Sequence, residues 1–393
     1  MKKTIKVVEL FSGCGGLSEG FSTKNYQLVS SVEIDKDSCE THINRLMQHK
    51  YKLNDINQII HNSDIRKEET LNVFKNNSIC GNIDVLLAGI PCQSFSSAGK
   101  AKDRHSMKND PRNWLYINFL HYLKAIKPKV FVIENVKGIM SSVRKGINIL
   151  DDILESAKKS GFIISENKRE MLLNSYYFSV PQNRERIFII GVKANLNKSP
   201  SKIYQVLNKL KIENKNLFNV EDAIKDLPFL LQGQGEEEIN FYPSKSNKYL
   251  KKIRNKNFKK LYNHVCRGHN KLDMERFKYL SKNVWELTDL SRVRPDLIHH
   301  DPLHFKNRYT VQQWKKPGRT VIAHIHKDGN LFIHPDYKQQ RTFTVREAAR
   351  IQSFPDDFRF YGSRTSQFKQ VGNAVPPMMA KKISEVIYDV VFK

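Results

Sequence analysis

Short apolar runs alternate with helix-like segments along the first half of the chain. The runs are apolar throughout instead of at every second position, as in strands that are buried on both faces. We expect these strands at 6–11, 28–34, 85–90, 130–134 and 187–192. Helical periodicity lies between them, for example at 114–126 and 148–160. The alternation predicts an α/β fold with a doubly wound, mostly parallel sheet.

The pattern changes after about residue 195. Residues 196–260 are rich in Lys, Asn and Ser, with an acidic run at 236–238. A basic stretch follows, made of Lys251, Lys252, Arg254, Lys256, Lys259 and Lys260 with Phe258 and Tyr262 interleaved. It is compatible with a solvated helix face and with a surface that tracks phosphates. A β-like pattern starts near 309 and includes 320–323 and a hairpin signal at 328–329, and helical patterns return at 344–353 and 376–392.

Composition narrows the choice of partner. The 393 residues include 66 Lys plus Arg against 40 Asp plus Glu, a net charge of +26. Such a charge favours a polyanionic partner, nucleic acid first and an acidic membrane surface second. The five cysteines form no CxxC pair, so we expect neither a disulfide framework nor a metal site, and a reducing, cytoplasmic setting. We find no signal peptide and no apolar run long enough to span a membrane.

The ends of the first strands carry a candidate nucleotide site. The turn at 12–16 holds three glycines, which allow the backbone to approach a ligand, although an ordinary strand-to-helix turn has the same pattern. Glu33 ends the second strand, where a carboxylate can accept both ribose hydroxyls. Asp64 and Ile65 suit an adenine ring. Because no phosphate-binding lysine or complete glycine-rich loop is present, these residues predict an adenosine ligand without pyrophosphate, such as S-adenosylmethionine.

The later strand ends carry candidate catalytic groups. Cys92 follows the third apolar run, and Glu134 ends the next one. A thiolate with a protonated carboxyl partner suits attack on an electron-poor ring, whereas a lone cysteine is more often a small buried apolar residue. Arg184 and Arg186 share one face of an extended segment and can bind a phosphate, a carbonyl or a carboxylate. A surface ion pair with Glu185 is the alternative for these arginines.

The ordered set of motifs resembles the DNA cytosine-5 methyltransferase family. The matching segments are 9–16 (with Glu9 where Asp is usual), 31–35, 63–65, Pro91-Cys92-Gln93, Glu134-Asn135-Val136, 182–186, 341–355 and 372–377. Each segment alone gives only modest support for the resemblance. Their order and spacing over 1–192 and 341–393 make the resemblance specific.

The resemblance implies a covalent mechanism. The Cys92 thiolate adds to C6 of a cytosine, Glu134 protonates or hydrogen-bonds N3, and C5 then takes the methyl group of S-adenosylmethionine. Arg184 and Arg186 orient the base and the catalytic groups. A stacked cytosine exposes neither face, so the base must leave the duplex.

The resemblance also assigns contacts. Those with S-adenosylmethionine fall on Phe11, Ser12, Gly13, Gly15, Gly16, Glu33, Ile34, Asp64, Ile65, Pro91, Asn373 and Val375. Those with DNA fall on Gln93, Ser94, Lys100, Arg104, Arg292, Arg294 and Arg319, the last three by residue type only.

The same resemblance predicts the domain plan and the partners. A catalytic and cofactor-binding domain covers 1–194 and 362–393, a smaller target-recognition domain 195–340, and a hinge segment 341–361. We expect a monomer that modifies a specific double-stranded DNA sequence within a restriction–modification system, alongside a possible cognate endonuclease. The alternatives are a tRNA cytosine-5 methyltransferase of the same fold, an inactive DNA-binding module and a NAD-dependent oxidoreductase.

Overall fold

A computed structural model describes most of the chain. The residues described are 4–76, 82–91, 114–144, 146–242, 246–255, 257, 259–298, 301, 303 and 308–393. They form two compact units. The sheet unit contains Met1–Phe178, Glu185–Asn214 and Pro377–Lys393, and the second unit contains Ser179–Arg184 and Lys215–Pro376. No helix in the described part of the chain is long and apolar enough to cross a membrane.

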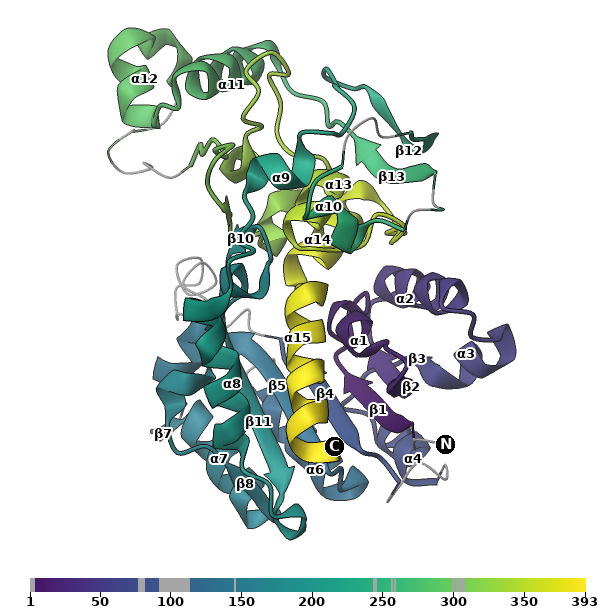
Figure 1. Cartoon of the computed structure of the whole chain (residues 1–393). Coiled ribbons are helices and arrows are strands. Elements are labelled where there is room, and N and C mark those ends of the chain that lie inside the picture. The colour runs from purple at the N-terminus through teal and green to yellow at the C-terminus, as the bar shows by residue number, and fades with distance from the viewer. Residues whose placement is uncertain are drawn as a thin grey trace. The chain divides into compact units, whose positions relative to one another are not determined.

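The sheet unit is built on an eight-stranded sheet (Figure 1). Its order is β3-β2-β1-β4-β5-β11-β8, and β9 pairs with β11. The strands are β1 Ile5–Leu10, β2 Tyr26–Glu33, β3 Ile60–Asn62, β4 Val85–Gly89, β5 Val130–Val136, β8 Phe162–Ile164, β9 Leu172–Asn174 and β11 Glu185–Lys193. The first five in spatial order are parallel, and β11 runs antiparallel to β5, β8 and β9. The mostly parallel sheet expected from the apolar runs is confirmed.

The strand order creates a switch point between β1 and β4. The chain proceeds from β1 through β2 to β3 on one side, and resumes with β4 and β5 on the other. In open parallel sheets, ligands bind beyond the carboxyl ends of the strands at such a point. The residues that follow β1 and β4 are therefore expected to line a ligand site.

Helices cover the sheet and bring the end of the chain back to its start. They are α1 Gly16–Phe21, α2 Lys36–Gln48, α3 Leu53–Ile59, α4 Glu68–Asn76, α6 Leu115–Ile126, α7 Ile149–Lys159, α8 Pro200–Glu213 and α15 Pro377–Ile387. Helix α15, yellow in Figure 1, contacts both α1 and α8. The Ser384 hydroxyl donates to the carbonyl of Gly20 at 2.9 Å, and the Tyr26 hydroxyl donates to the carbonyl of Ser384 at 2.8 Å.

The second unit is assembled from short elements. These are β10 Gln182–Asn183, α9 Val220–Ile224, β12 Gly235–Asn240, α10 Leu250–Ile253, β13 Lys260–Val265, α11 Lys271–Asn283, α12 Leu287–Val293, β14 Gly318–Arg319, α13 Val345–Ile351 and α14 Arg364–Asn373. β12 and β13 form an antiparallel hairpin, and β10 pairs in parallel with β14.

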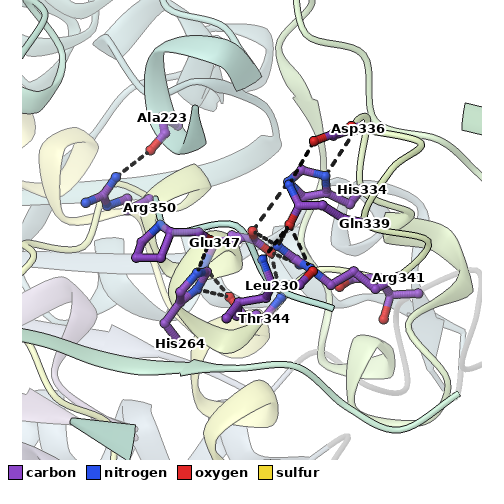
Figure 2. A network of polar contacts seen from close by, with 12 residues as sticks. Ala223, Leu230, His264, His334, Asp336, Gln339, Arg341, Thr344, Glu347 and Arg350 are labelled. Atoms are coloured by element: carbon purple, nitrogen blue, oxygen red, sulfur yellow. Dashed lines mark hydrogen bonds and ion pairs between the residues drawn. The ribbon is translucent and has the colours of Figure 1, made fainter. Parts of the chain in front are cut away.

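Buried charges hold the second unit together (Figure 2). The Arg341 guanidinium makes two hydrogen bonds of 2.7 Å with the carboxylate of Glu347. Glu347 also completes a capping box with Thr344 at the start of α13. Burial lowers the pKa of His334 to about 3, so this imidazole, 3.4 Å from Glu347, is neutral at pH 7. Buried charges that are paired and hydrogen-bonded in this way avoid the large cost of desolvating an isolated ion.

Two local expectations for the second unit are wrong. Residues 320–323 are not a strand, because the backbone of Val321 is bonded by side chains: its N–H donates to Gln182 and its carbonyl accepts from Arg184. Residues 328–329 do not make a hairpin, because a 3-10 turn at Asn330–Phe332 follows Gly329 directly.

The predicted bounds of the catalytic and target-recognition domains stay predictions, and the compact units are defined by their packing. Helix α8 packs on α15 and β11 and so belongs to the sheet unit, whereas α14 packs on α13 and stays in the second unit.

Candidate active site

The turn after β1 has a shape that only glycine permits at one point. Gly15 has a φ of +85°, and a Cβ there would lie 2.7 Å from Cδ2 of His42. The turn is tied to β2, since the Ser31 hydroxyl donates to the Ser12 hydroxyl at 2.8 Å. Gly13 also has a positive φ, as does Phe11. The backbone is therefore held open to a ligand without side chains in the way.

Glu33 presents a fixed carboxylate at the end of β2. One oxygen accepts the N–H of Gly13 at 2.8 Å, and the other accepts those of Ile34 and Asp35, each at 2.9 Å. Burial raises the pKa of this carboxyl. Carboxylate oxygens keep further acceptor capacity after such bonds. Beside it, the apolar Ile34 side chain is 62% exposed.

Glu9 is a carboxyl that the sequence alone marked only as an unusual residue. It is 1% exposed, near the end of β1. Desolvation raises its pKa to about 8, against which hydrogen bonds from Ser18 act. Its Oε2 has no hydrogen-bond partner among the described residues. Glu9 is therefore mostly protonated at pH 7, whereas a glutamate side chain in water is ionised at this pH.

The Asp64 carboxylate is bonded to Arg66. Both of its oxygens accept from this guanidinium, at distances between 2.5 and 3.0 Å, and the interaction lowers the pKa of Asp64. Ile65 is buried, and its carbonyl lies 3.3 Å from the Tyr122 hydroxyl. The expected adenine contacts of both residues stay predictions.

Glu134 and Arg186 meet at the carboxyl end of β5. Glu134 is paired in register with Gly89, the last residue of β4, and with Phe188 of β11. Its Oε1 lies 3.0 Å from Nε of Arg186, and both side chains are nearly buried. The contact is an ion pair, not a well-directed hydrogen bond, and Oε1 has no hydrogen-bond partner within the described ranges.

Asn135 anchors the segment that leads toward Cys92. Its Nδ2 donates to the carbonyl of Ile90 at 3.3 Å, and its Oδ1 accepts the N–H of Val136 at 2.8 Å. The chain therefore leaves β4 beside Glu134, and Pro91 is half-buried there. Cys92, Gln93, Ser94, Lys100 and Arg104 lie outside the described residues.

Arg184 lies in a different environment from Arg186. It is 1% exposed within the second unit. It donates to the carbonyl of Val321 at 2.5 Å and to those of Gly372 and Ala374 at 3.4 and 3.1 Å. The side-chain oxygen of Gln182 accepts a hydrogen bond from the N–H of Val321 at 2.7 Å. The Gln-x-Arg part of the motif thus fixes the backbone after β14, which the sequence did not indicate.

The other expected contacts are spread over the second unit. Arg292 is exposed, 3.9 Å from Asp289, whereas Arg294 is bonded to Glu275 and Asp296. Arg319 donates to the Thr310 hydroxyl at 2.7 Å and, with Lys316 and Asn183, lines a cavity of about 530 Å³. Asn373 is the last residue of α14, and the buried Val375 follows it.

Comparison with known proteins identifies the family. Residues 5–389 match the model of the C-5 cytosine-specific DNA methylase family. The chain is 33% identical over 403 residues to the Type II methyltransferase M.DdeI of Desulfomicrobium norvegicum, covering 98% of this chain and 88% of that protein. It is 29% identical over 446 residues to the Type II methyltransferase M.Bpa9945I of Bacillus paralicheniformis, covering 98% and 99%.

Solved structures share the fold. A candidate DNA modification methyltransferase encoded within a prophage (E. coli) superimposes with a TM-score of 0.72 at 24% identity, covering 99% of this chain and all of that one. The Dnmt2 methyltransferase of S. pombe does so with a TM-score of 0.56 at 14% identity, covering 99% and 98%. The fold is that of an α/β methyltransferase. The chain belongs to the C-5 cytosine-specific DNA methylase family and is a DNA cytosine-5 methyltransferase.

Proposed function

We propose that this chain transfers a methyl group from S-adenosylmethionine to C5 of a flipped-out cytosine in a specific double-stranded DNA sequence. It does so as the modification enzyme of a type II restriction–modification system. The two sequence relatives described above are Type II methyltransferases. Because they and the family model concern DNA methylation, a tRNA substrate is not favoured.

The observation that carries the proposal is the Glu134–Arg186 pair beside the end of β4. Its two side chains are 3.0 Å apart and shielded from water. Strand pairing sets Glu134 next to Gly89, three residues before Cys92. Because Cys92 follows β4 in the sequence, we expect its thiol and the Glu134 carboxyl to act on one base.

The residues near β1 and β2 fit the adenosyl group of the cofactor. Glu33 is fixed by three backbone N–H groups, so its oxygens are pre-oriented toward ribose hydroxyls. The exposed Ile34 offers an apolar surface to the adenine, and the space beside Gly13, where a Cβ would have no atom within 4 Å, is proposed for the methionine part. Asn373 and Val375 stay proposed contacts of the same ligand. S-adenosylmethionine, when bound, supplies a methyl group activated by a sulfonium.

Cys92 and Glu134 activate the base. The Cys92 thiolate forms a bond to C6 while Glu134 gives a proton to N3, so the electron pair of the C5–C6 double bond becomes available at C5. After methyl transfer, loss of the C5 proton to water expels the thiolate, N3 returns its proton to Glu134, and the aromatic ring is restored. Arg186 orients Glu134 and faces the base. Arg184 acts as a positioning residue, since its donors are spent on backbone carbonyls.

Bisulfite sequencing of plasmid DNA from cells that express the protein tests the function directly. We expect full protection of one cytosine in every copy of one short sequence. Cells that express Cys92→Ser should show none. Absence of protected cytosines with the unaltered protein would contradict the proposal.

A further inference from the structure

The segment 239–272 is the most one-sidedly charged part of the chain. It contains ten Lys and Arg residues and no Asp or Glu. A run of like charge is often only a solvated surface. Only those cations that have no ion pair within the fold are available to a partner.

Two of the cations are neutralised by carboxylates. Arg254, directly after α10, is bonded to Asp226 at 2.6 Å and to Asp356 at 3.0 Å. Lys260, at the start of β13, is paired with Glu238. Both residues thus serve the fold of the second unit and are not available to a partner.

Four other lysines of the segment have no ion-pair partner among the described residues. Lys248, Lys251, Lys252 and Lys259 are all exposed. In α10, Leu250 and Ile253 are buried, so the two lysines between them extend into solvent. The charged side of helix α10 therefore faces solvent because its apolar side is buried.

These lysines lie in or next to helix α10 and beside the end of the β12–β13 hairpin, two elements of the second unit (Figure 1). The Arg254 guanidinium lies 5.6 Å from the ring of Phe241, which links the end of α10 to the end of the hairpin. The Phe241 N–H donates to the carbonyl of Lys259 at 2.8 Å. The Lys259 ammonium lies 5.7 Å from the ring of Tyr242, which is 69% exposed. We call Tyr242, Lys248, Lys251, Lys252 and Lys259 the lysine patch.

The three carboxylates of the hairpin form no ion pair with the lysine patch. Glu238 is paired with both Lys260 and Arg359. Glu237 accepts from Asn263 and Gln367. Glu236 lies opposite His264 in the strand register of the hairpin. It is four residues, or about 13 Å along the strand, from the end of the hairpin at Asn240 and Lys260. Four lysines thus face two hairpin carboxylates without an ion pair among the described residues, Glu236 and Glu237, so positive charge is in excess here.

We propose that the lysine patch binds the phosphodiester backbone of duplex DNA whatever its base sequence. The inference rests on the proposed function, because it takes DNA as the partner. Lysine ammonium groups on flexible stems bind phosphates as point charges and carry no sequence information. The patch then adds affinity that is independent of sequence and strongly dependent on salt.

Binding of a 40-bp duplex of random sequence, followed by fluorescence anisotropy between 50 and 300 mM KCl, tests the proposal. The test variant is Lys251→Gln/Lys252→Gln/Lys259→Gln. Each lost phosphate contact lowers the slope of log K against log salt by about 0.9. We expect the slope to fall by about 2.7 and the affinity at 50 mM KCl to fall by about tenfold for each lysine.

The matched control is Lys271→Gln/Lys278→Gln/Lys282→Gln, which removes the same charge from exposed positions of α11 in the same unit. It should keep the slope of the unaltered protein. Equal slopes for the two triple variants would overturn the proposal. Should the test variant fail to fold by circular dichroism, Lys251→Gln/Lys252→Gln alone must lower the slope by about 1.8. Methylation of plasmid DNA by the unaltered protein tests the proposed function separately.

Discussion

In the proposed mechanism Glu134 gives a proton to the base, and Arg186 is its neighbour at 3.0 Å. A glutamine there keeps the shape but cannot protonate N3. We expect Glu134→Gln to lower kcat by about 100-fold or more, in the range of general acid catalysis. Methyl transfer to plasmid DNA under single-turnover conditions measures this.

The neighbouring carboxylate provides the control for that variant. Glu185 is half-exposed and pairs only with Lys137 among the described residues. Glu185→Gln should keep kcat within about twofold, since exposed pairs contribute little. If both variants transferred methyl groups at the normal rate, Glu134 would not be the acid.

Glu9 makes stability depend on pH. Its pKa is about 8 in the folded protein, above the ordinary value of 4.5, so the folded state binds a proton that the unfolded state has lost. The free energy of unfolding therefore falls as pH rises from about 4.5 to 8, by at most about 1.4 kcal/mol per pH unit from this group. Glu9→Gln should remove this dependence. Urea denaturation at pH 6 and pH 9 measures it.

An exposed carboxyl is the comparison for Glu9. Glu40 is exposed on α2. The free energy of unfolding of a Glu40→Gln protein should depend on pH as that of the unaltered protein does. A Glu9→Gln protein that lost stability between pH 6 and 9 as steeply as the unaltered protein would show that the buried carboxyl is already ionised at pH 6.

Residue types at strand ends could be predicted, but not their partners. The position of Glu33 at the end of β2 followed from the apolar pattern, and its three N–H bonds depend on a turn shape that only the fold fixes. Arg184 and Arg186 are two residues apart in one motif, yet one contacts backbone carbonyls and the other a carboxylate. Spacing cannot separate these roles, because long-range packing decides which carbonyl each arginine meets.

At the scale of elements, the contact between α1 and α15 depends on one glycine. A Cβ on Gly20 would lie 2.3 Å from the backbone nitrogen of Lys381 and 2.4 Å from Cβ of Ala380. Helix propensity alone predicts that Gly20→Ala gains about 1 kcal/mol. Because backbone atoms cannot move aside easily, we expect instead a loss of about 1–3 kcal/mol. Urea denaturation followed by circular dichroism decides the sign.

Gly268→Ala is the matched substitution, because the nearest atom to its Cβ would be 4.0 Å away, on the flexible Gln232 side chain. We expect a change of less than about 0.5 kcal/mol there. A stabilised Gly20→Ala protein would mean that the two helices are not in close contact.

Elements with strong local patterns were predictable, and those held by side chains were not. The apolar runs located β1, β2, β4, β5 and β11, because burial on both faces requires them. Residues 320–323 have a strand-like composition, but Gln182 and Arg184 satisfy the backbone of Val321 in place of a neighbouring strand. The membership of α8 was equally hidden, since its partner α15 lies far along the chain.

At the scale of the whole molecule, cofactor binding should stabilise the sheet unit. S-adenosylhomocysteine at a hundred times its Kd adds about 2.7 kcal/mol to a folded state that alone binds it. Glu33→Gln should lose most of this gain, and the exposed Glu40→Gln should keep it. Thermal unfolding with and without the ligand measures the difference, so any effect of Glu33→Gln on the ligand-free protein cancels. An equal ligand-induced shift in both variants would remove Glu33 from the cofactor site.

The covalent bond between Cys92 and the target base is the central claim. Duplex DNA with 5-fluorocytosine at the methylated position blocks loss of the C5 substituent, so the enzyme should stay attached after methyl transfer. We predict a protein–DNA band that survives denaturing electrophoresis, depends on S-adenosylmethionine and is absent with Cys92→Ser. A methyltransferase that is active on ordinary DNA but forms no such band, or forms it equally with Cys92→Ser, would contradict the account.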